Sequence, residues 1–325
     1  MAIPTLAADS RLQECVDSLG RQTLQDFEVI VIDNSGKGQW QRTGIRAIHN
    51  PRNVGFGAAV NQAFHASTAP YFATLNDDAV PHPEWLARLV SALQRRPDAG
   101  MCASQVRLFG EERLDSAGML VARDGSSKQR GHGRFPADFP VLEEILFPSA
   151  SAALYRRSML AEIGGFDDSF FLYCEDTDLG LRARWAGWKS LYVPAAVVEH
   201  HYSHSAGRAS PVKAYYVERN RLFVLAKNFP APMLLAAPFS TLARYTWHLL
   251  YLIQGRGSAA RFRAEGHAGP RMLWYVIRAH AALLARIPRL RRQRREIRAR
   301  ARITPAIFRH LVRTHSISAR RIAAL

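Results

Sequence analysis

Residues 27–36, FEVIVIDNSG, decide the fold. The first six residues form a nearly continuous apolar run rich in β-branched side chains, which is typical of a strand covered on both faces. Asp33–Gly36 then supplies turn-forming residues, and Leu12, Val16 and Leu19 before the run follow helical spacing. A helix, a buried strand and a turn in this order predict an α/β protein.

The same alternation continues along the chain. Further strands are predicted at 45–48 and 71–75, and helices at 55–66 and 83–94. Strand–helix repeats of this length favour an open parallel sheet, whose ligands bind beyond the carboxyl ends of the strands. Asp33 and the group Asn76–Asp78 both follow strands, so we expect them at that rim.

Charge divides the chain into two parts. The sequence of 325 residues has 44 Lys and Arg against 27 Asp and Glu, a formal net charge of +17. Residues 226–325 contain 20 of the basic residues and only two acids, so this segment carries +18, whereas residues 1–225 carry −1. We expect one domain at residues 1–228 and a helical, arginine-rich region at 229–325. Length and hydrophobic content exclude a disordered chain and a small disulfide scaffold.

Other signals bear on the compartment. Cys15, Cys102 and Cys174 lack a CxxC spacing, so neither disulfides nor a thiolate zinc site is expected, and reduced thiols fit a cytoplasmic protein. We expect no signal peptide, because the first eleven residues have neither a basic nor an apolar region, and no membrane span, because no uncharged stretch reaches ~18–20 apolar residues. Only three residues precede Pro4-Thr5, so the first strand is expected to be short or to begin upstream.

Two acidic groups are suited to catalysis. Adjacent carboxylates in Asn76-Asp77-Asp78 favour a hard divalent cation such as Mg²⁺, and a solvated helix cap is the alternative. Glu175, Asp176 and Asp178 follow the aromatic run Phe170–Tyr173 where a helix is expected to begin. A carboxylate beside aromatic walls can act as a general base. Acids at a helix N-terminus also have a structural reason, the helix dipole.

Two weaker motifs complete the set. His200, His201 and His204 lie within five residues, and one imidazole could complete a metal site. The segment Asn53–Asn61 has a GxG sequence entering a helix, which is a weak sign of phosphate binding. Because the first strand–helix crossover contains no glycine triplet, a nicotinamide enzyme is not expected.

In this order the segments resemble the family 2 glycosyltransferases, inverting enzymes of the GT-A fold. The subgroup most similar includes bacterial rhamnosyltransferases and galactofuranosyltransferases of cell-surface polysaccharide synthesis. The matching segments are VIVIDNSG (29–36), NVGFGAAVNQAF (53–64), YFATLNDDAVPHPEWL (71–86), GGFDDSFFLYCEDTDLGLRARWAGW (164–188), AVVEHHYSHSAG (196–207) and YYVERNRLFVLAKNFP (215–230). The resemblance implies a Rossmann-like open mixed sheet flanked by helices, with a mainly helical basic C-terminal extension.

The resemblance also implies roles on the donor side. Asp33 matches the acid that contacts the nucleotide base, Asn53 and Asn61 flank the loop and helix beside the nucleotide, and Arg219 lies where relatives carry polar residues near the donor phosphates. The residues expected at the donor nucleotide are Thr5, Asp33, Asn53, Asn61, Asn76, Asp77 and Arg219.

The metal, the base and the acceptor side are assigned in the same way. Asp78 matches the last acid of the GT-A metal motif, and His200 the histidine that reaches the metal, so both are expected to bind Mg²⁺ or Mn²⁺. Adjacent His201 leaves the register open, and Asn76 departs from the Asp-x-Asp pattern. Asp176 matches the catalytic base. Residues expected on the acceptor side are Phe171, Tyr173 and Glu175.

The function implied is metal-dependent, inverting transfer of a rhamnose- or galactofuranose-type sugar from a dTDP- or UDP-linked donor to a lipid-linked or polysaccharide acceptor of the cell envelope. The first alternative, a sugar-phosphate nucleotidyltransferase, should carry a glycine-rich basic loop after the first strand, and residues 5–12 contain no glycine. The second is a non-catalytic membrane-bound scaffold.

The basic tail suggests a location. Arginines beside apolar helices favour peripheral binding to an anionic membrane, here the inner face of the plasma membrane. A solvated basic helix remains an alternative. Nucleic-acid binding is less favoured, because no nucleic-acid-binding motif accompanies the charge.

Overall fold

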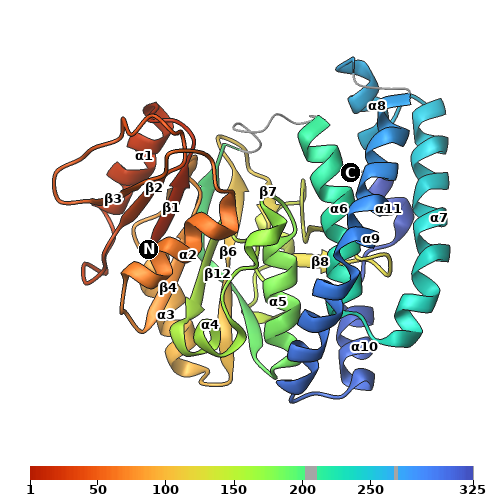
Figure 1. The fold of residues 1–325 in the computed structure, drawn as a ribbon. Helices are drawn as coiled ribbons and strands as arrows, with labels where there is room; N and C mark the ends of the chain where they lie inside the picture. Colours follow the sequence, from red (N-terminus) through yellow and green to blue (C-terminus); the bar gives the residue numbers. More distant parts are fainter. Residues whose placement is uncertain (202–210, 267–269, 325) are drawn as a thin grey trace. The chain divides into compact units, whose positions relative to one another are not determined.

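The computed structural model describes residues 1–201, 211–266 and 270–324, which form two compact units (Figure 1). The first unit comprises residues 1–119, 129–184 and 188–204, and the second residues 120–128, 185–187 and 205–325. The domain boundary predicted at residue 228 follows composition. In the structure, the second compact unit also contains α6 (Pro211–Asn228) and residues 120–128, which precede that boundary.

A mixed sheet forms the centre of the first unit. Ten strands belong to it among the described residues. Its order is β10 (Glu143–Ile145), β12 (Lys189–His200), β6 (Ala99–Leu108), β11 (Ala152–Arg156), β4 (Tyr71–Leu75), β1 (Ala2–Thr5), β2 (Ile30–Asp33) and β3 (Arg46–His49), with β5 (Ala79–Pro81) on β12 and β7 (Leu114–Ser116) on β6. Strands β1 to β4 run parallel, and β11 is antiparallel to both β4 and β6.

The strand predicted at 27–32 begins later than expected. It starts at Ile30, because its partner β1 is only four residues long and pairs Ala2 with Ile30 through Thr5 with Asp33. A strand is defined by its ladder, so the apolar pattern of residues 27–29 cannot extend it without a partner.

Helices flank this sheet. They are α1 (Ser10–Leu19), α2 (Phe56–Ala66), α3 (Trp85–Arg95), α4 (Arg157–Ile163) and α5 (Glu175–Trp185). In α3, Trp85, Leu89 and Leu93 recur at every fourth residue and are fully buried, as a helix with one apolar face requires. The helices predicted at 55–66 and 83–94 are therefore confirmed to within two residues at their ends.

The second unit is mainly helical. Besides α6 it contains α7 (Ala231–Ile253), α8 (Gly257–Ala264), α9 (Pro270–Ala299), α10 (Pro305–Thr314) and α11 (Ala319–Ala324). The apolar helix predicted at 272–287 and most of the basic run after it form one continuous helix, α9, which passes through Pro288. Within the described ranges, no helix combines the length and apolar character needed to cross a bilayer.

Several arginines of the second unit are internal. The side chains of Arg221 and Arg244 pair with the buried carboxylates of Glu218 and Asp124. Arg298 lies 3.3 Å from the ring centroid of Trp185 and donates to the Asn228 carbonyl at 2.8 Å. Part of the basic charge of the tail therefore stabilises the fold and does not face solvent.

Candidate active site

The carboxyl ends of β1, β2 and β4 meet at one rim, as the strand pattern predicts. Parallel pairing places Thr5 beside Asp33, and the Thr5 hydroxyl donates to Asp77 Oδ2 at 2.6 Å. Asp33 is buried and accepts a hydrogen bond from the Ser35 amide at 2.9 Å. Burial would raise the pKa of Asp33, but its hydrogen bonds to Ser35 outweigh burial and hold the pKa below its usual range.

Asp78 faces His200 at the centre of this rim. β12 pairs its last residues with β5, so that His200 lies opposite Ala79 and next to Asp78. His200 Nε2 lies 3.0 Å from Asp78 Oδ1, and His200 Nδ1 lies 2.9 Å from Asp115 Oδ2. Asp115 also lies 3.2 Å from Nδ1 of His132. All three members of the trio Asp78–His200–Asp115 are at most 6% exposed.

This trio is electrostatically coupled. Burial of the imidazole lowers the pKa of His200, but hydrogen bonds to Asp115 and Asp78 outweigh burial and raise it to about 10. Burial likewise raises the pKa of Asp115, and hydrogen bonds from His132 and His200 bring it down to about 2. The pKa of Asp78 is also lowered, because its hydrogen bond to His200 exceeds the effect of burial. A cation at this position, here the imidazolium, is therefore strongly favoured.

Sequence reasoning missed Asp115. It lies in the glycine-rich middle of the chain, on the short strand β7, and reaches His200 because β6 pairs with both β7 and β12. A lone acid between a leucine and a serine gives no local signal of this role. Only a buried-acid pattern on a predicted strand could have drawn attention to it.

Of the residues near the trio in sequence, Asn76 contacts His200, whereas Asp77 and His201 bind other side chains. Asn76 Nδ2 lies 3.2 Å from His200 Nε2. Asp77 bonds to Thr5, and burial raises its pKa to about 6. His201 stacks on Phe109 with ring centroids 3.7 Å apart, and its Nε2 lies 3.1 Å from Glu14. Of the two adjacent histidines, it is thus His200 whose imidazole lies against the Asp78 carboxylate, and the predicted His204 lies outside the described residues.

A strained segment leads into α5. Phe171, Tyr173 and Cys174 all have positive φ, at 64°, 68° and 65°. The Phe171 carbonyl accepts from the Phe56 amide at 2.8 Å, and a Cβ on Gly55 would lie 2.4 Å from that carbonyl oxygen. Gly55 is therefore required by close backbone approach. Left-handed backbone at three non-glycine residues is costly and is typical of functional segments.

The pair Glu175 and Asp176 follows this segment at the start of α5. Asp176 accepts hydrogen bonds from the amides of Thr177, at 2.6 Å, and Ala150, at 3.4 Å. Glu175 Oε2 is buried and has no hydrogen-bond partner among the residues that the structure describes. Burial raises the pKa of both carboxyl groups, and the nearby charge of Asp176 raises the pKa of Glu175 further. Buried carboxyl groups with raised pKa are suited to proton transfer near neutral pH.

Two other predicted residues, Asn53 and Asn61, form hydrogen bonds within the protein. Asn53 Oδ1 accepts from the Gly55 amide at 2.8 Å. The Asn61 amide group bonds to both backbone groups of Phe166 and to Asp168. Both asparagines thus hold the loops around Gly55 and before the strained segment.

Arg219 belongs to α6 in the second unit. Its guanidinium lies 4.6 Å from the ring centroid of Tyr216 and 5.2 Å from that of Phe223, and it donates to Asn220 Oδ1 at 2.8 Å. Burial lowers the pKa of Arg219. Such aromatic contacts orient a guanidinium.

The sequence of the chain is similar to those of known enzymes. The family model described as glycosyl transferase family 2 matches residues 1–164. The chain is 30% identical over 243 residues to N-acetylglucosaminyl-diphospho-decaprenol L-rhamnosyltransferase from Mycobacterium tuberculosis, which covers 65% of this chain and 79% of that protein. It is 42% identical over 67 residues to rhamnosyltransferase WbbL from Escherichia coli, which covers 21% of this chain and 25% of that protein.

A solved structure is similar in fold. The structure of GalNAc-T7 with UDP, GalNAc and Mn²⁺ matches with a TM-score of 0.59 at 14% sequence identity, over 88% of this chain and 57% of that chain. At this identity the likeness concerns the fold alone. The predicted open mixed sheet flanked by helices, with a helical C-terminal extension, is confirmed.

Proposed function

Because the chain belongs to glycosyl transferase family 2, a family of sugar-transferring enzymes, we propose that it moves a rhamnose- or galactofuranose-type sugar from a nucleotide-diphosphate donor to a lipid-linked or polysaccharide acceptor. The observation that carries the proposal is the buried pair Glu175 and Asp176 behind the strained segment, in the same unit as the Asp78–His200 contact. The rhamnosyltransferase relatives support the type of sugar.

Asp176 is the proposed general base. It accepts the proton of the acceptor hydroxyl as that oxygen forms a bond to the anomeric carbon, while the bond from this carbon to the donor diphosphate breaks. A single displacement inverts the anomeric configuration and needs no covalent enzyme intermediate. Burial raises the pKa of Asp176, which makes its carboxylate a stronger base than an exposed one.

The residues of the rim fit a divalent cation. Asp78 offers a carboxylate, and Asp115 holds Nδ1 of His200, so Nε2 would become a ligand atom when a metal ion displaces the proton that the imidazolium carries there. Within the described part of the chain, no three His, Cys, Asp or Glu side chains form a complete metal site, so donor phosphates and waters would supply the other ligands. Asp78 and His200 would thus hold Mg²⁺ or Mn²⁺, which as a Lewis acid stabilises charge on the leaving diphosphate. The solved neighbour contains Mn²⁺.

The other predicted residues are assigned to the donor or to the acceptor. Thr5, Asp33, Asn76 and Asp77 would contact the nucleotide directly. Asn53 and Asn61 would act by holding the loops they bind, and Arg219 would approach the donor phosphates. The acceptor side would be formed by Phe171, Tyr173 and Glu175. Glu175 Oε2, which has no hydrogen-bond partner in the described ranges, would be available for an acceptor hydroxyl.

Membrane association is the last part of the proposal. Large apolar side chains, among them Phe239, Ile253 and Trp274, are more than half exposed on α7 and α9. Exposed apolar faces beside arginines are typical of helices that lie in a membrane interface. We therefore place the second unit at an anionic membrane surface on the cytoplasmic side.

Nucleotide release from a panel of donors tests the proposal. dTDP-rhamnose and UDP-galactofuranose should release nucleotide with Mg²⁺ or Mn²⁺, and EDTA should abolish the release. Release of pyrophosphate from a nucleoside triphosphate and a sugar phosphate would instead identify a nucleotidyltransferase. No release from any donor would support the non-catalytic scaffold.

A further inference from the structure

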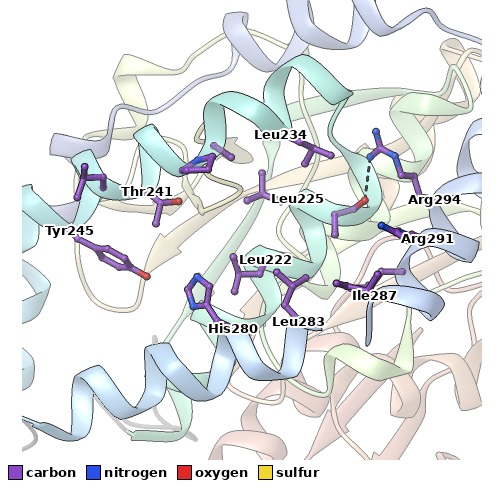
Figure 2. A pocket seen from close by; sticks show the side chains of 15 residues that line it. Leu222, Leu225, Leu234, Thr241, Tyr245, His280, Leu283, Ile287, Arg291 and Arg294 are labelled. Carbon is purple, nitrogen blue, oxygen red and sulfur yellow. Dashed lines mark hydrogen bonds between the residues drawn. The ribbon is translucent and has the colours of Figure 1, made fainter. Parts of the chain in front are cut away.

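An apolar pocket lies wholly within the second unit (Figure 2). Its volume is about 710 Å³, within the range of pockets that bury a small ligand. Its walls come from α6, α7 and α9 and are mainly aliphatic. They include Leu222, Leu225, Leu234, Ala237, Leu283 and Ile287.

The polar groups of the pocket are placed unevenly. Thr241 and Tyr245 lie on one side, and Arg291 and Arg294 on the other (Figure 2). The Tyr245 hydroxyl is hydrogen-bonded to Glu218, and Arg294 donates to the Ala226 carbonyl at 3.2 Å. Arg291 is exposed and has no ion-pair partner in the part of the chain that the structure describes. One side of the pocket therefore offers a cation without a counterion.

The pocket continues into an exposed apolar face of α7. Leu235, Phe239, Leu242, Leu249 and Ile253 recur at intervals of three, four or seven residues and are all more than half exposed. Leu242 belongs both to this face and to the pocket wall. An apolar chain could therefore pass from the face into the pocket without crossing polar surface.

We propose that this pocket binds the hydrocarbon chain of a polyprenyl-diphosphate-linked acceptor, with the diphosphate at Arg291. The inference rests on the proposed function in so far as that function uses a lipid-linked acceptor. An apolar cavity with a cationic side is complementary to an anionic head group on an apolar chain. A polyanion without such a chain would leave the aliphatic walls unused, and a neutral apolar ligand would leave Arg291 without a counterion.

Direct binding of farnesyl diphosphate to the full-length chain tests the proposal by isothermal titration calorimetry. Two pairs of neighbouring residues provide matched variants. Leu283→Trp and Leu234→Trp fill the pocket, whereas Leu284→Trp and Ala236→Trp place the same ring on exposed surface outside both the pocket and the apolar face of α7. The pocket variants should weaken binding by roughly tenfold or more, because several methylene groups lose their burial, and the surface variants should leave affinity unchanged.

The charge at the pocket is tested separately. Arg291→Gln should weaken farnesyl diphosphate by several-fold, as expected for loss of one charged hydrogen bond, and should leave farnesol unaffected. Arg295→Gln, an exposed arginine outside the pocket, is the control. Pyrophosphate alone should bind more weakly than farnesyl diphosphate. Lysophosphatidic acid should compete poorly.

The outcomes separate the pocket from the enzyme activity. Equal affinities for Leu283→Trp and Leu284→Trp, with both variants folded by circular dichroism, would overturn the pocket even if sugar transfer to a lipid acceptor is measured. If Leu283→Trp unfolds, the affinities of Leu234→Trp and Ala236→Trp are compared in its place. Tighter binding of lysophosphatidic acid than of farnesyl diphosphate would assign the pocket to membrane phospholipid and overturn the proposal. Pocket-dependent binding together with an inactive donor panel would retain the pocket and reject the proposed function.

Discussion

Each unit buries a pair of acids, and the two pairs differ in whether they meet a counterion. In the second unit, Glu218 and Asp124 meet Arg221 and Arg244, and nearby arginines lower the pKa of Glu218 to about 2 although burial opposes this. In the first unit, burial raises the pKa of Glu175 and Asp176, and within the described part of the chain Glu175 Oε2 has no hydrogen-bond partner. Carboxylates that meet buried cations stay charged and hold one conformation, whereas buried carboxyl groups without a counterion keep a raised pKa, which suits proton transfer at a cost in stability. Buried acids that meet arginines therefore indicate residues that hold the fold, and buried acids with a raised pKa indicate candidates for catalysis.

The largest effect is expected at Asp176. Asp176→Asn removes the proposed base and should lower kcat by about 10²–10⁴-fold, the contribution of a positioned general base, with the KM for donor little changed. Steady-state nucleotide release with acceptor measures this. Asp138→Asn, an exposed carboxylate of the same unit, is the control. Near-normal turnover of Asp176→Asn would show that Asp176 is not the base.

The next effect tests the paired charges of the second unit. Arg221→Met leaves Glu218 and Asp124 buried with one cation fewer and should lower the free energy of unfolding by about 3–5 kcal/mol. Urea unfolding of this variant should be compared with that of Arg295→Met, whose side chain is exposed. Identical midpoints would mean that the network contributes no stability and that the contrast between the units is false.

Asp115 tests the link between structure and metal binding. Asp115→Asn removes the carboxylate that orients His200 and should weaken Mn²⁺ binding by about 10–100-fold, as for other carboxylates that support a ligating histidine. Calorimetric titration of Mn²⁺ gives this without enzyme turnover. Asp98→Asn, a partly exposed carboxylate at the opposite end of β6 from the residue that pairs with His200, should bind as wild type. A lower kcat with unchanged Mn²⁺ affinity would refute a positioning role.

The pH dependence of stability probes Glu175. Burial raises its pKa in the folded state above the unfolded value of about 4.3, so folding takes up a proton between these two values. Stability of the wild type therefore falls as pH rises through that window, by up to about 1.4 kcal/mol per pH unit. The glutamine in Glu175→Gln does not titrate. The Tm of this variant minus that of the wild type should therefore be larger at about pH 7 than at about pH 5. A constant Tm difference would mean that Glu175 keeps an ordinary pKa.

The smallest effect concerns the exposed arginines. Each basic residue near an anionic bilayer contributes about 1 kcal/mol, so Arg295→Gln with Arg300→Gln should weaken vesicle binding by roughly 30-fold. Sedimentation with phosphatidylserine vesicles measures this. Arg88→Gln with Arg113→Gln removes the same charge from the first unit and should have little effect. Binding that does not depend on anionic lipid would contradict membrane docking through these arginines.

Local patterns predicted much of the first unit. The strand at 71–75, the helix that follows Gly55 and the start of α5 at Glu175 lie where the sequence places them. Periodicity and turn chemistry act over a few residues, so one chain suffices to predict them. Residues 27–29 failed as a strand because pairing depends on a distant partner.

By itself the sequence determined the order of strands and helices, the acids at the strand ends and the concentration of charge in the last hundred residues. These follow from composition and short-range pattern. Only the tertiary structure decided that Asp115 meets His200 across 85 residues, that His201 turns to Glu14, and that Arg221 serves as an internal counterion. The physical reason is that burial and side-chain pairing depend on which strands and helices become neighbours, and that choice is made by the packing of the whole chain.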